Sequence, residues 1–163
     1  MFCIKCGSEL QEGLIDNRQR KRCKVCGWVF YPQLKVGTAG IITDNGKVLL
    51  LLRSQEPWKN FWNLPAGYVD DDENPQFAVK REIEEETGLL VSDIKLFNVY
   101  FFNDDPRGNG ILIVYQCSTV VGELKLNFEN SDFRYFTASE IPENLCGAGH
   151  KKAILDWKQL NED

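Results

Sequence analysis

The sequence predicts an α+β sandwich that follows a small cysteine-rich module. Two Cys-x2-Cys pairs lie within the first 26 residues, and apolar, β-rich runs begin at residue 34. One helix pattern interrupts these runs near mid-chain, and a second pattern lies at the C-terminus. Strands gathered around one helix, with another helix at the end, pack as layers over a shared core. The chain of 163 residues is long enough for one such core and the small module.

Composition and charge exclude several classes of protein. Apolar residues make up 43% of the chain and charged residues 26%, which is typical of a globular protein in water. The sequence lacks an apolar run of the roughly 20 residues that span a bilayer, and its N-terminus does not resemble a secretory signal. We therefore expect a cytoplasmic protein without membrane contact. The net charge of −5 argues against nucleic acid as a general partner.

The cysteine spacing predicts a structural zinc site. Cys3 and Cys6 form one pair, Cys23 and Cys26 the other, and sixteen residues separate the pairs. This spacing is typical of a Cys₄ zinc ribbon, and we expect residues 1–31 to form one that needs Zn²⁺ to fold. A set of reduced, buried thiols is the alternative. The basic residues between the pairs are either surface charges of a hairpin or contacts for phosphate or nucleic acid: Arg18, Arg20, Lys21, Arg22 and Lys24.

The main domain is expected at residues 34–163, beginning with two strands. The runs LKVGTAGIIT and KVLLLLR are joined by Asp44-Asn45-Gly46, a strong hairpin signal. Arg53 ends the second run, where it either faces a substrate or is an ordinary strand-end charge. Trp62 follows a loop that also holds Trp58 and Phe61, and these rings either stack on a base or pack.

A helix is predicted between residues 75 and 87. Asn74 is a good N-cap, Pro75 suits the first helical position, and Gly88 tolerates the left-handed conformation that ends helices. Val79 and Ile83 share one face of this helix and are expected to enter the core.

The charges of this helix are unusual. Glu82, Glu85 and Glu86 fall within an arc of roughly 100° in its C-terminal half, where the helix dipole is already negative. Each such carboxylate costs about 0.3–1 kcal/mol of stability. Divalent cations would relieve this repulsion, and oxygen ligands beside a glycine-containing loop favour Mg²⁺ or Mn²⁺. A solvated acidic face is the alternative.

The second half of the domain has further strand signals and a terminal helix. Extended runs cover residues 89–102, 111–121 and 133–136, one helical turn is expected at 138–143, and a helix at 151–160. The apolar residues of that last helix are Ile154, Leu155, Trp157 and Leu160. Cys146 is a candidate free thiol; the sole histidine, His150, follows four residues later and makes a weak nucleophile–base pair with it.

The mid-chain motif resembles a known family signature. The pattern G-x5-E-x7-R-E-U-x-E-E-x-G-U, where U is a bulky aliphatic residue, is filled by Gly67, Glu73, Arg81, Glu82, Ile83, Glu85, Glu86, Gly88 and Leu89. It resembles the Nudix box of the Nudix hydrolases. A Cys₄ ribbon directly before it resembles zinc-ribbon Nudix proteins such as the NADH pyrophosphatases. Their SQPWPFP segment is replaced here by NVYFFNDDPRGNG, so the chain looks closer to relatives that act on ADP-ribose, FAD or similar substrates.

The resemblance implies a fold, an activity and roles for particular residues. The fold is a mixed β-sheet between helices. The activity is metal-dependent hydrolysis of a nucleoside diphosphate linked to another moiety, of the ADP-ribose, FAD or NADH type. Glu82 and Glu86, with Glu85 and the carbonyl of Ala66, would hold Mg²⁺ or Mn²⁺, while Arg81 would orient the glutamates. A homodimer is plausible by the same resemblance.

Two further residues are candidate members of the site. Glu129 matches a late-loop glutamate that relatives use as ligand or general base, although a surface glutamate is an equal reading. Arg107 lies in the turn-rich loop 104–110, which is either a specificity loop that contacts phosphate or ribose, or a structural turn. Two other functions stay open: a non-catalytic nucleotide-sensing Nudix regulator, and a zinc-ribbon protein that acts on nucleotide-capped RNA.

Overall fold

The computed structural model describes residues 1–162. The chain forms two compact units, Met1–Gln33 and the part from Leu34 onward. No helix in the described part of the chain combines the length and apolar character needed to cross a membrane.

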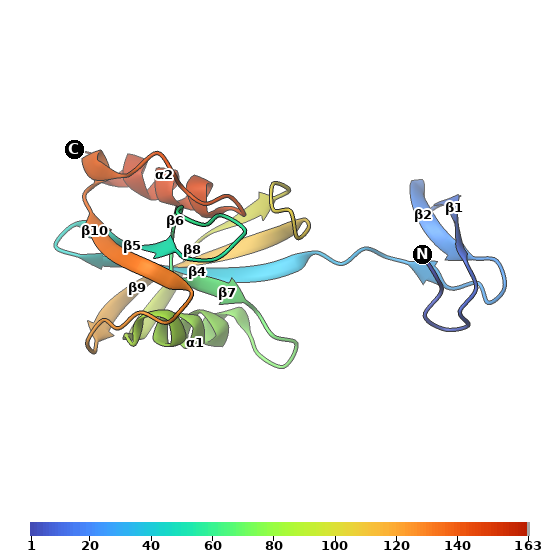
Figure 1. The fold of residues 1–163 in the computed structure, drawn as a ribbon, viewed down its shortest axis with the longest axis horizontal. Helices are drawn as coiled ribbons and strands as arrows, with labels where there is room; N and C mark the ends of the chain where they lie inside the picture. Colours follow the sequence, from blue (N-terminus) through green and yellow to red (C-terminus); the bar gives the residue numbers. More distant parts are fainter. Residues whose placement is uncertain (163) are drawn as a thin grey trace. The chain divides into compact units, whose positions relative to one another are not determined.

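The first unit is a three-stranded antiparallel sheet (Figure 1). Its strands are β1 (Leu10–Ile15), β2 (Arg18–Cys23) and β3 (Val29–Phe30), in the order β1-β2-β3. The unit's core is small: Cys3, Leu10 and Cys23 are buried, with Trp28 and Phe30 packed against them. So little apolar burial is insufficient for a unit of this size, which therefore depends on its cysteines.

The second unit is built on a seven-stranded sheet (Figure 1). The central order is β10-β5-β4-β9-β8, with β6 beside β5 and β7 beside β4. The pair β4–β9 is parallel and the other pairs are antiparallel, so the sheet is mixed, as the resemblance implies. The bounds are β4 Lys35–Asp44, β5 Lys47–Arg53, β6 Trp62–Asn63, β7 Ala66–Tyr68, β8 Leu90–Phe102, β9 Gly110–Val121 and β10 Asn130–Phe136.

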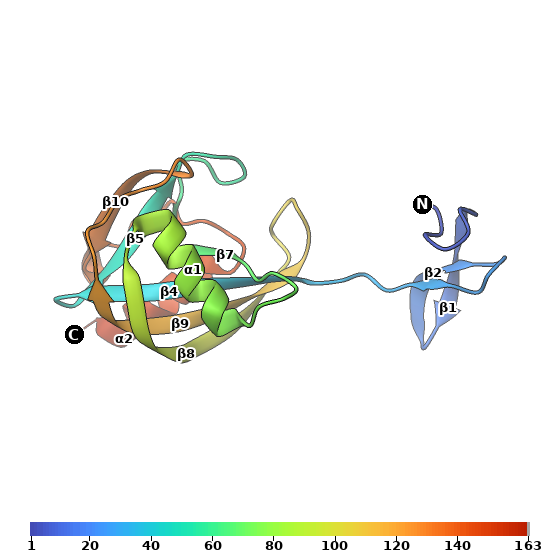
Figure 2. The ribbon, with the colours of Figure 1, turned by 90° about the horizontal axis from the view of Figure 1, so that it is seen from below.

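Two helices cover opposite faces of this sheet, which makes the predicted sandwich. Helix α1 (Pro75–Thr87) lies on one side and α2 (His150–Asn161) on the other, as two perpendicular views show (Figures 1 and 2). Alternate residues of the strands serve the two layers. Ile41 packs in the core cluster that holds Trp157 of α2, and its neighbour Ile42 packs in the cluster that holds Ile83 of α1.

Helix α1 begins and ends at the predicted residues. The Asn74 side chain accepts hydrogen bonds from the N–H groups of Gln76 and Phe77, each 3.0 Å long. Gly88 has φ +70°, and its N–H donates to the carbonyl of Glu84. These caps fix the register of the helix, so that Val79 and Ile83 face the core and the glutamates flank them.

Several local expectations need correction. Leu155 and Leu160 of α2 are 41% and 72% exposed, so only Ile154 and Trp157 of the expected apolar set are buried. The strand expected at 133–136 begins at Asn130, and the turn expected at 138–143 is a 3₁₀ helix over Ala138–Glu140. Strands β6 and β7 were not predicted, because two or three residues carry no readable periodicity.

Candidate active site

A cavity of about 280 Å³ lies in the second unit, between the helix α1 motif and the start of α2. Its acidic lining residues are Asp70, Glu82, Asp105 and Glu129, and its basic ones are Arg53, Arg81 and Arg107. A larger hollow of about 600 Å³, lined by Leu89, Gln116 and Tyr135 among others, contains none of the motif glutamates. The smaller cavity is therefore the candidate site.

Glu82 reaches the cavity because residue 67 has no side chain. Gly67 lies in β7, and a Cβ built on it would overlap the Glu82 carboxylate. Burial raises the pKa of Glu82, while its hydrogen bond from Arg81 (2.8 Å) works in the opposite direction. The spacing between Gly67 and Glu82 in the motif thus brings one carboxylate against β7.

Glu86 is a buried carboxylate, only 2% exposed. Its Oε2 accepts the main-chain N–H of Ala66 at 2.9 Å, and its Oε1 accepts from Asn130 Nδ2 at 3.4 Å. Burial raises the pKa of Glu86 to about 8, and the negative charges of Glu82 and Glu129 add to this shift. Within residues 1–162 no lysine or arginine pairs with Glu86. A buried carboxylate without a cation partner is costly and suits a metal ion.

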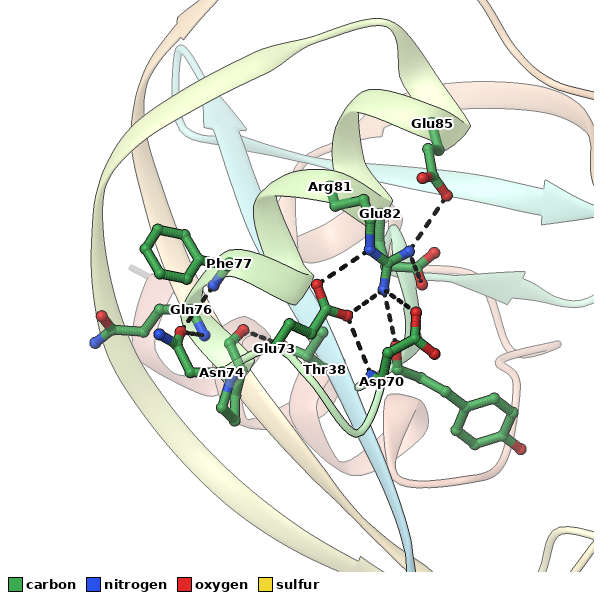
Figure 3. Close-up of polar contacts among 11 residues, drawn as sticks. Thr38, Asp70, Glu73, Asn74, Gln76, Phe77, Arg81, Glu82 and Glu85 are labelled. Carbon is green, nitrogen blue, oxygen red and sulfur yellow. Dashed lines mark hydrogen bonds and ion pairs between the residues drawn. The ribbon is translucent and has the colours of Figure 1, made fainter.

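Arg81 connects the acidic residues of the motif (Figure 3). Its guanidinium donates to Glu73 (Nε to Oε2, 3.2 Å), to Glu82 and to Glu85 (3.3 Å). It also donates to the carbonyl of Tyr68 at 3.1 Å. The bonds to Glu73 and Glu82 raise the pKa of Arg81, and the bond from Arg81 lowers the pKa of Glu73. Arg81 therefore stays charged and holds Glu73 and Glu82 in fixed positions.

The basic part of the cavity is formed around Arg107. Arg107 makes a bidentate ion pair with Asp105 (Nη2–Oδ2, 2.7 Å), whose side chain is 1% exposed. Burial opposes ionisation of Asp105, but the hydrogen bonds from Arg107 outweigh it and lower the pKa of Asp105. Arg107 and Lys35 lie over the Tyr68 ring at 5.5 and 5.3 Å from its centroid. Arg53 also lines the cavity, with its Nε bonded to the carbonyl of Pro57.

Comparison with known proteins agrees with this geometry. A family model described as "NUDIX domain" matches residues 32–158, and one described as "Nudix N-terminal" matches residues 1–32. The chain belongs to the Nudix hydrolase family. It is 34% identical over 152 residues to an ADP-ribose pyrophosphatase of Methanocaldococcus jannaschii, covering 93% of this chain and 86% of that protein.

Two other Nudix proteins are informative. The NAD-capped RNA hydrolase NudC of Vibrio vulnificus is 26% identical over 165 residues, and this chain spans only 59% of its length. A crystal structure of a Nudix hydrolase from Nitrosomonas europaea superposes with a TM-score of 0.77, covering 97% of this chain and 90% of that chain. At 22% identity this second likeness shows the fold.

The ribbon of this Nudix protein has the geometry of a tetrahedral zinc site. The Sγ atoms of Cys3, Cys6, Cys23 and Cys26 all lie within 4.8 Å of one another, and the distances Cys3–Cys26 and Cys6–Cys23 are 3.5 Å. A tetrahedron with Zn–S bonds of about 2.3 Å has edges of about 3.8 Å. Disulfides are much shorter, at about 2.05 Å, and these cysteines are free thiols.

The Nudix motif also offers ligands for a divalent cation, although they are less tightly gathered. In the described part of the chain, the four cysteines have ligand atoms within 4.8 Å of one another, and the carboxylates of Glu82, Glu85 and Glu86 are not gathered this closely. Glu85 is bonded to Arg81, with its side chain 57% exposed. Hard oxygen atoms from Glu82, Glu86 and the main chain at Ala66 fit Mg²⁺ or Mn²⁺. A bound cation would also favour the ionised form of Glu86, which burial alone disfavours.

The remaining sequence-based candidates divide between the cavity and the core. Glu129, Arg53 and Arg107 line the cavity. Trp62 does not: its ring packs on Phe136 at a centroid distance of 4.9 Å, which supports the packing alternative. Cys146 is buried, and burial raises its pKa to about 12, so it is not an activated nucleophile.

Sequence reasoning missed several polar residues of the site. Asn63, Tyr68, Asp105 and His150 line the cavity, and Asn130 bonds Glu86. The sequence carries a weak signal for Asn130, which is adjacent to Glu129. Asn63 lies on β6 and His150 at the start of α2, so these two residues are far apart in the chain and only the folded domain brings both to one cavity.

Proposed function

We propose that this chain is a Mg²⁺- or Mn²⁺-dependent pyrophosphohydrolase. Its substrate is a nucleoside diphosphate linked to a second moiety, and its products are a nucleoside monophosphate and a second phosphate. The observation that carries the proposal is the buried Glu86 carboxylate, which has no cationic partner among residues 1–162, while Arg53 and Arg107 line the same cavity as Glu82. Acidic residues that attract metal and basic residues that attract phosphate suit a diphosphate.

The roles of the residues follow from their surroundings. Glu82, Glu86 and the carbonyl of Ala66 would hold the metal, which supplies charge neutralisation at the phosphoryl oxygens and activation of water. Arg81 keeps Glu82 oriented through its 2.8 Å bond. Glu129 accepts a proton from the attacking water, because it lines the cavity and is close enough to raise the pKa of both Glu82 and Glu86.

ADP-ribose is the first substrate to test. The relative with 34% identity carries the name ADP-ribose pyrophosphatase, and this chain covers most of its length. The cavity volume of about 280 Å³ is just below the range of about 300–1,000 Å³ that is usual for ligand sites, which suits a diphosphate with one adjoining sugar better than a whole enclosed dinucleotide. FAD and NADH share the diphosphate and differ in what adjoins it.

A substrate panel tests the proposal. Purified protein with Mg²⁺ or Mn²⁺ is incubated with ADP-ribose, FAD, NADH, NAD, diadenosine polyphosphates and nucleoside triphosphates, and the products are separated by chromatography. We expect AMP and ribose 5-phosphate from ADP-ribose, with a clear preference over the triphosphates. Tight binding of one of these compounds without turnover would instead support the regulator alternative.

NAD-capped RNA is a second candidate substrate. Residues 1–33 contain six lysines or arginines and three acidic residues, a net charge of +3 on a chain whose total is −5. The exposed Arg18 and Arg22 lie on β2 of the ribbon. If RNA is the substrate, kcat/KM for NAD-capped RNA should exceed that for NAD, fall with salt, and fall in an Arg18→Gln, Arg22→Gln double variant. Equal values for NAD and capped RNA would remove this candidate.

A further inference from the structure

Two buried polar side chains of the cavity have an atom without a hydrogen-bond partner in the described chain. Asn63 is 1% exposed and His150 is 8% exposed, and both line the cavity. The unpaired atoms are Asn63 Oδ1 and His150 Nδ1. Leaving such atoms unpaired is expensive, and native proteins do so rarely. A ligand that bonds to both atoms would remove this cost.

The free atom of Asn63 is an acceptor. Its Nδ2 donates to the carbonyl of Leu64 at 2.8 Å, and this bond fixes the orientation of the amide. Oδ1 is therefore the atom left over, and it needs an O–H or N–H group from a ligand. Phe102 and Leu112 line the same cavity and make part of its wall apolar.

His150 is a neutral imidazole. Burial lowers its pKa to about 3, and the positive charges of Arg53 and Arg107 lower it further, while Asp105 opposes them. A neutral imidazole offers one donor and one acceptor. A neutral imidazole does not attract an anion, so we expect Arg53 and Arg107 to be the residues that bind phosphate.

The chain before His150 is held in place by specific contacts. Asp104 Oδ1 accepts the N–H of Ala148 at 3.0 Å. A Cβ on residue 147 would lie 2.5 Å from the Trp58 ring and 2.7 Å from Asp104 Oδ2, so only glycine fits there. This packing fixes the point at which α2 begins, and with it the position of the imidazole.

We propose that Asn63 and His150 form a subsite for the sugar that adjoins the diphosphate, binding its hydroxyl groups while Arg53 and Arg107 contact the phosphates. A hydroxyl both donates and accepts, which matches an amide oxygen and a neutral imidazole that line one cavity. In nucleotides and sugar phosphates the group attached directly to phosphate is a sugar, so a sugar lies next to the phosphate-binding arginines. This inference rests on the proposed function, because it assumes that a diphosphate occupies the cavity.

The wild-type protein provides the first test. Three substrates are compared: ADP-ribose, the P2-methyl ester of ADP, and ADP-ribose built on 2′,3′-dideoxyadenosine. The analogue that lacks the hydroxyl groups bound by Asn63 and His150 should have a kcat/KM about 10- to 100-fold lower than that of ADP-ribose. A loss with the methyl ester assigns the subsite to the terminal sugar, and a loss with the dideoxy analogue assigns it to the nucleoside ribose. If both analogues are hydrolysed as fast as ADP-ribose, the proposal is wrong.

Variants link this loss to the two residues. His150→Phe and Asn63→Leu should lower kcat/KM for ADP-ribose about 10- to 100-fold and change it less than about threefold for the discriminated analogue. His150→Gln, which keeps hydrogen-bonding capacity, should recover part of the loss. Asn98→Leu, an exposed position on β8 outside the cavity, is the matched control. An equal loss with ADP-ribose and the analogue would mean a structural role and would overturn the proposal.

Binding measurements separate this inference from the proposed function. Titration calorimetry on Glu86→Gln protein with Mg²⁺ measures the affinity for ADP-ribose and for the discriminated analogue without turnover. If the wild type hydrolyses nothing but binds ADP-ribose at least tenfold more tightly than the analogue, the proposed function fails and the subsite stands. If the two affinities are equal, the subsite fails even when hydrolysis is observed.

Discussion

The main-chain N–H of Ala66 donates a 2.9 Å hydrogen bond to the carboxylate of Glu86. This bond joins strand β7 to helix α1 at the point where the motif glycine follows. Glu86 is only 2% exposed. The bond keeps its carboxylate next to Ala66, whose carbonyl is a proposed ligand of the metal. The position of Glu86 therefore depends on both elements.

The raised pKa of Glu86 has a consequence for stability. Burial raises the pKa of Glu86 from its ordinary value of 4.5 to about 8 in the folded state, so the native protein binds a proton that the unfolded chain releases. In buffer without Mg²⁺ or Mn²⁺, the free energy of unfolding should therefore fall as the pH rises from about 4.5 to about 8, by about 3–5 kcal/mol at most. Glu86→Gln should remove most of this dependence.

Denaturant unfolding at pH 5.5 and pH 8, with zinc retained, measures this effect. Glu84→Gln is the matched control, because Glu84 lies on the same helix and is exposed. If the wild type and Glu86→Gln lose stability in parallel, the buried carboxyl is not the origin of the pH dependence.

Arg81→Lys should lower kcat by about 10- to 100-fold with a smaller effect on stability. A lysine keeps the charge but offers one nitrogen in place of the three, Nε, Nη1 and Nη2, that donate to Glu73, Glu82 and the Tyr68 carbonyl. Steady-state kinetics measures the change. Arg134→Lys, which alters an exposed pair with Glu140, should be silent, and a comparable loss in both variants would contradict the orienting role of Arg81.

Gly67→Ala should reduce activity through displacement of Glu82. The added Cβ would overlap the Glu82 carboxylate, so either the side chain or strand β7 must move. We expect a loss of at least about tenfold in kcat/KM, since a shift near 1 Å is costly at a catalytic centre. Gly13→Ala, where no atom lies within 4 Å of the new Cβ, is the control. Unchanged activity in Gly67→Ala would show that Glu82 need not occupy this position.

Removal of zinc should unfold residues 1–33 and leave the Nudix unit folded. The ribbon has only three buried core residues, whereas the second unit has two large core clusters. Cys26→Ser should lose zinc, measured by atomic emission, while the melting temperature of the main transition changes by less than about 3 °C. Cys117→Ser, a buried core position, should destabilise the protein and keep its zinc. A single cooperative loss of both units on zinc removal would contradict this independence.

Local sequence signals predicted the elements that depend on local chemistry. Asn74 and Gly88 define helix α1 because caps and left-handed glycines act within a few residues. The hairpin at Asn45-Gly46 follows from the same kind of signal, and both residues have positive φ. The motif spacing identified Glu82 and Glu86, and Glu86 proved to be buried as well as acidic.

The remainder required tertiary information. The sequence suggested His150 only as a weak base for Cys146. In the structure His150 lines the cavity, as Arg107 does. The hydrogen bond from Ala148 to Asp104 holds the loop from which α2 begins, and so positions His150. From the sequence, Trp62 could stack on a base, although aromatic rings in such a loop more often pack. Its ring neighbour, Phe136, comes from β10, some seventy residues later. No local pattern encodes such contacts. The homodimer stays a prediction, which sedimentation would test.

The most direct test of the account is the Mg²⁺ dependence of ADP-ribose hydrolysis in three proteins: the wild type, Glu86→Gln and Glu84→Gln. The wild type and Glu84→Gln should turn over ADP-ribose with the same Mg²⁺ requirement, because Glu84 is exposed and bonds nothing in the site. Glu86→Gln should be folded and at least about 100-fold slower at every Mg²⁺ concentration. Full activity in folded Glu86→Gln would contradict the claim that the buried carboxylate is the metal site of hydrolysis.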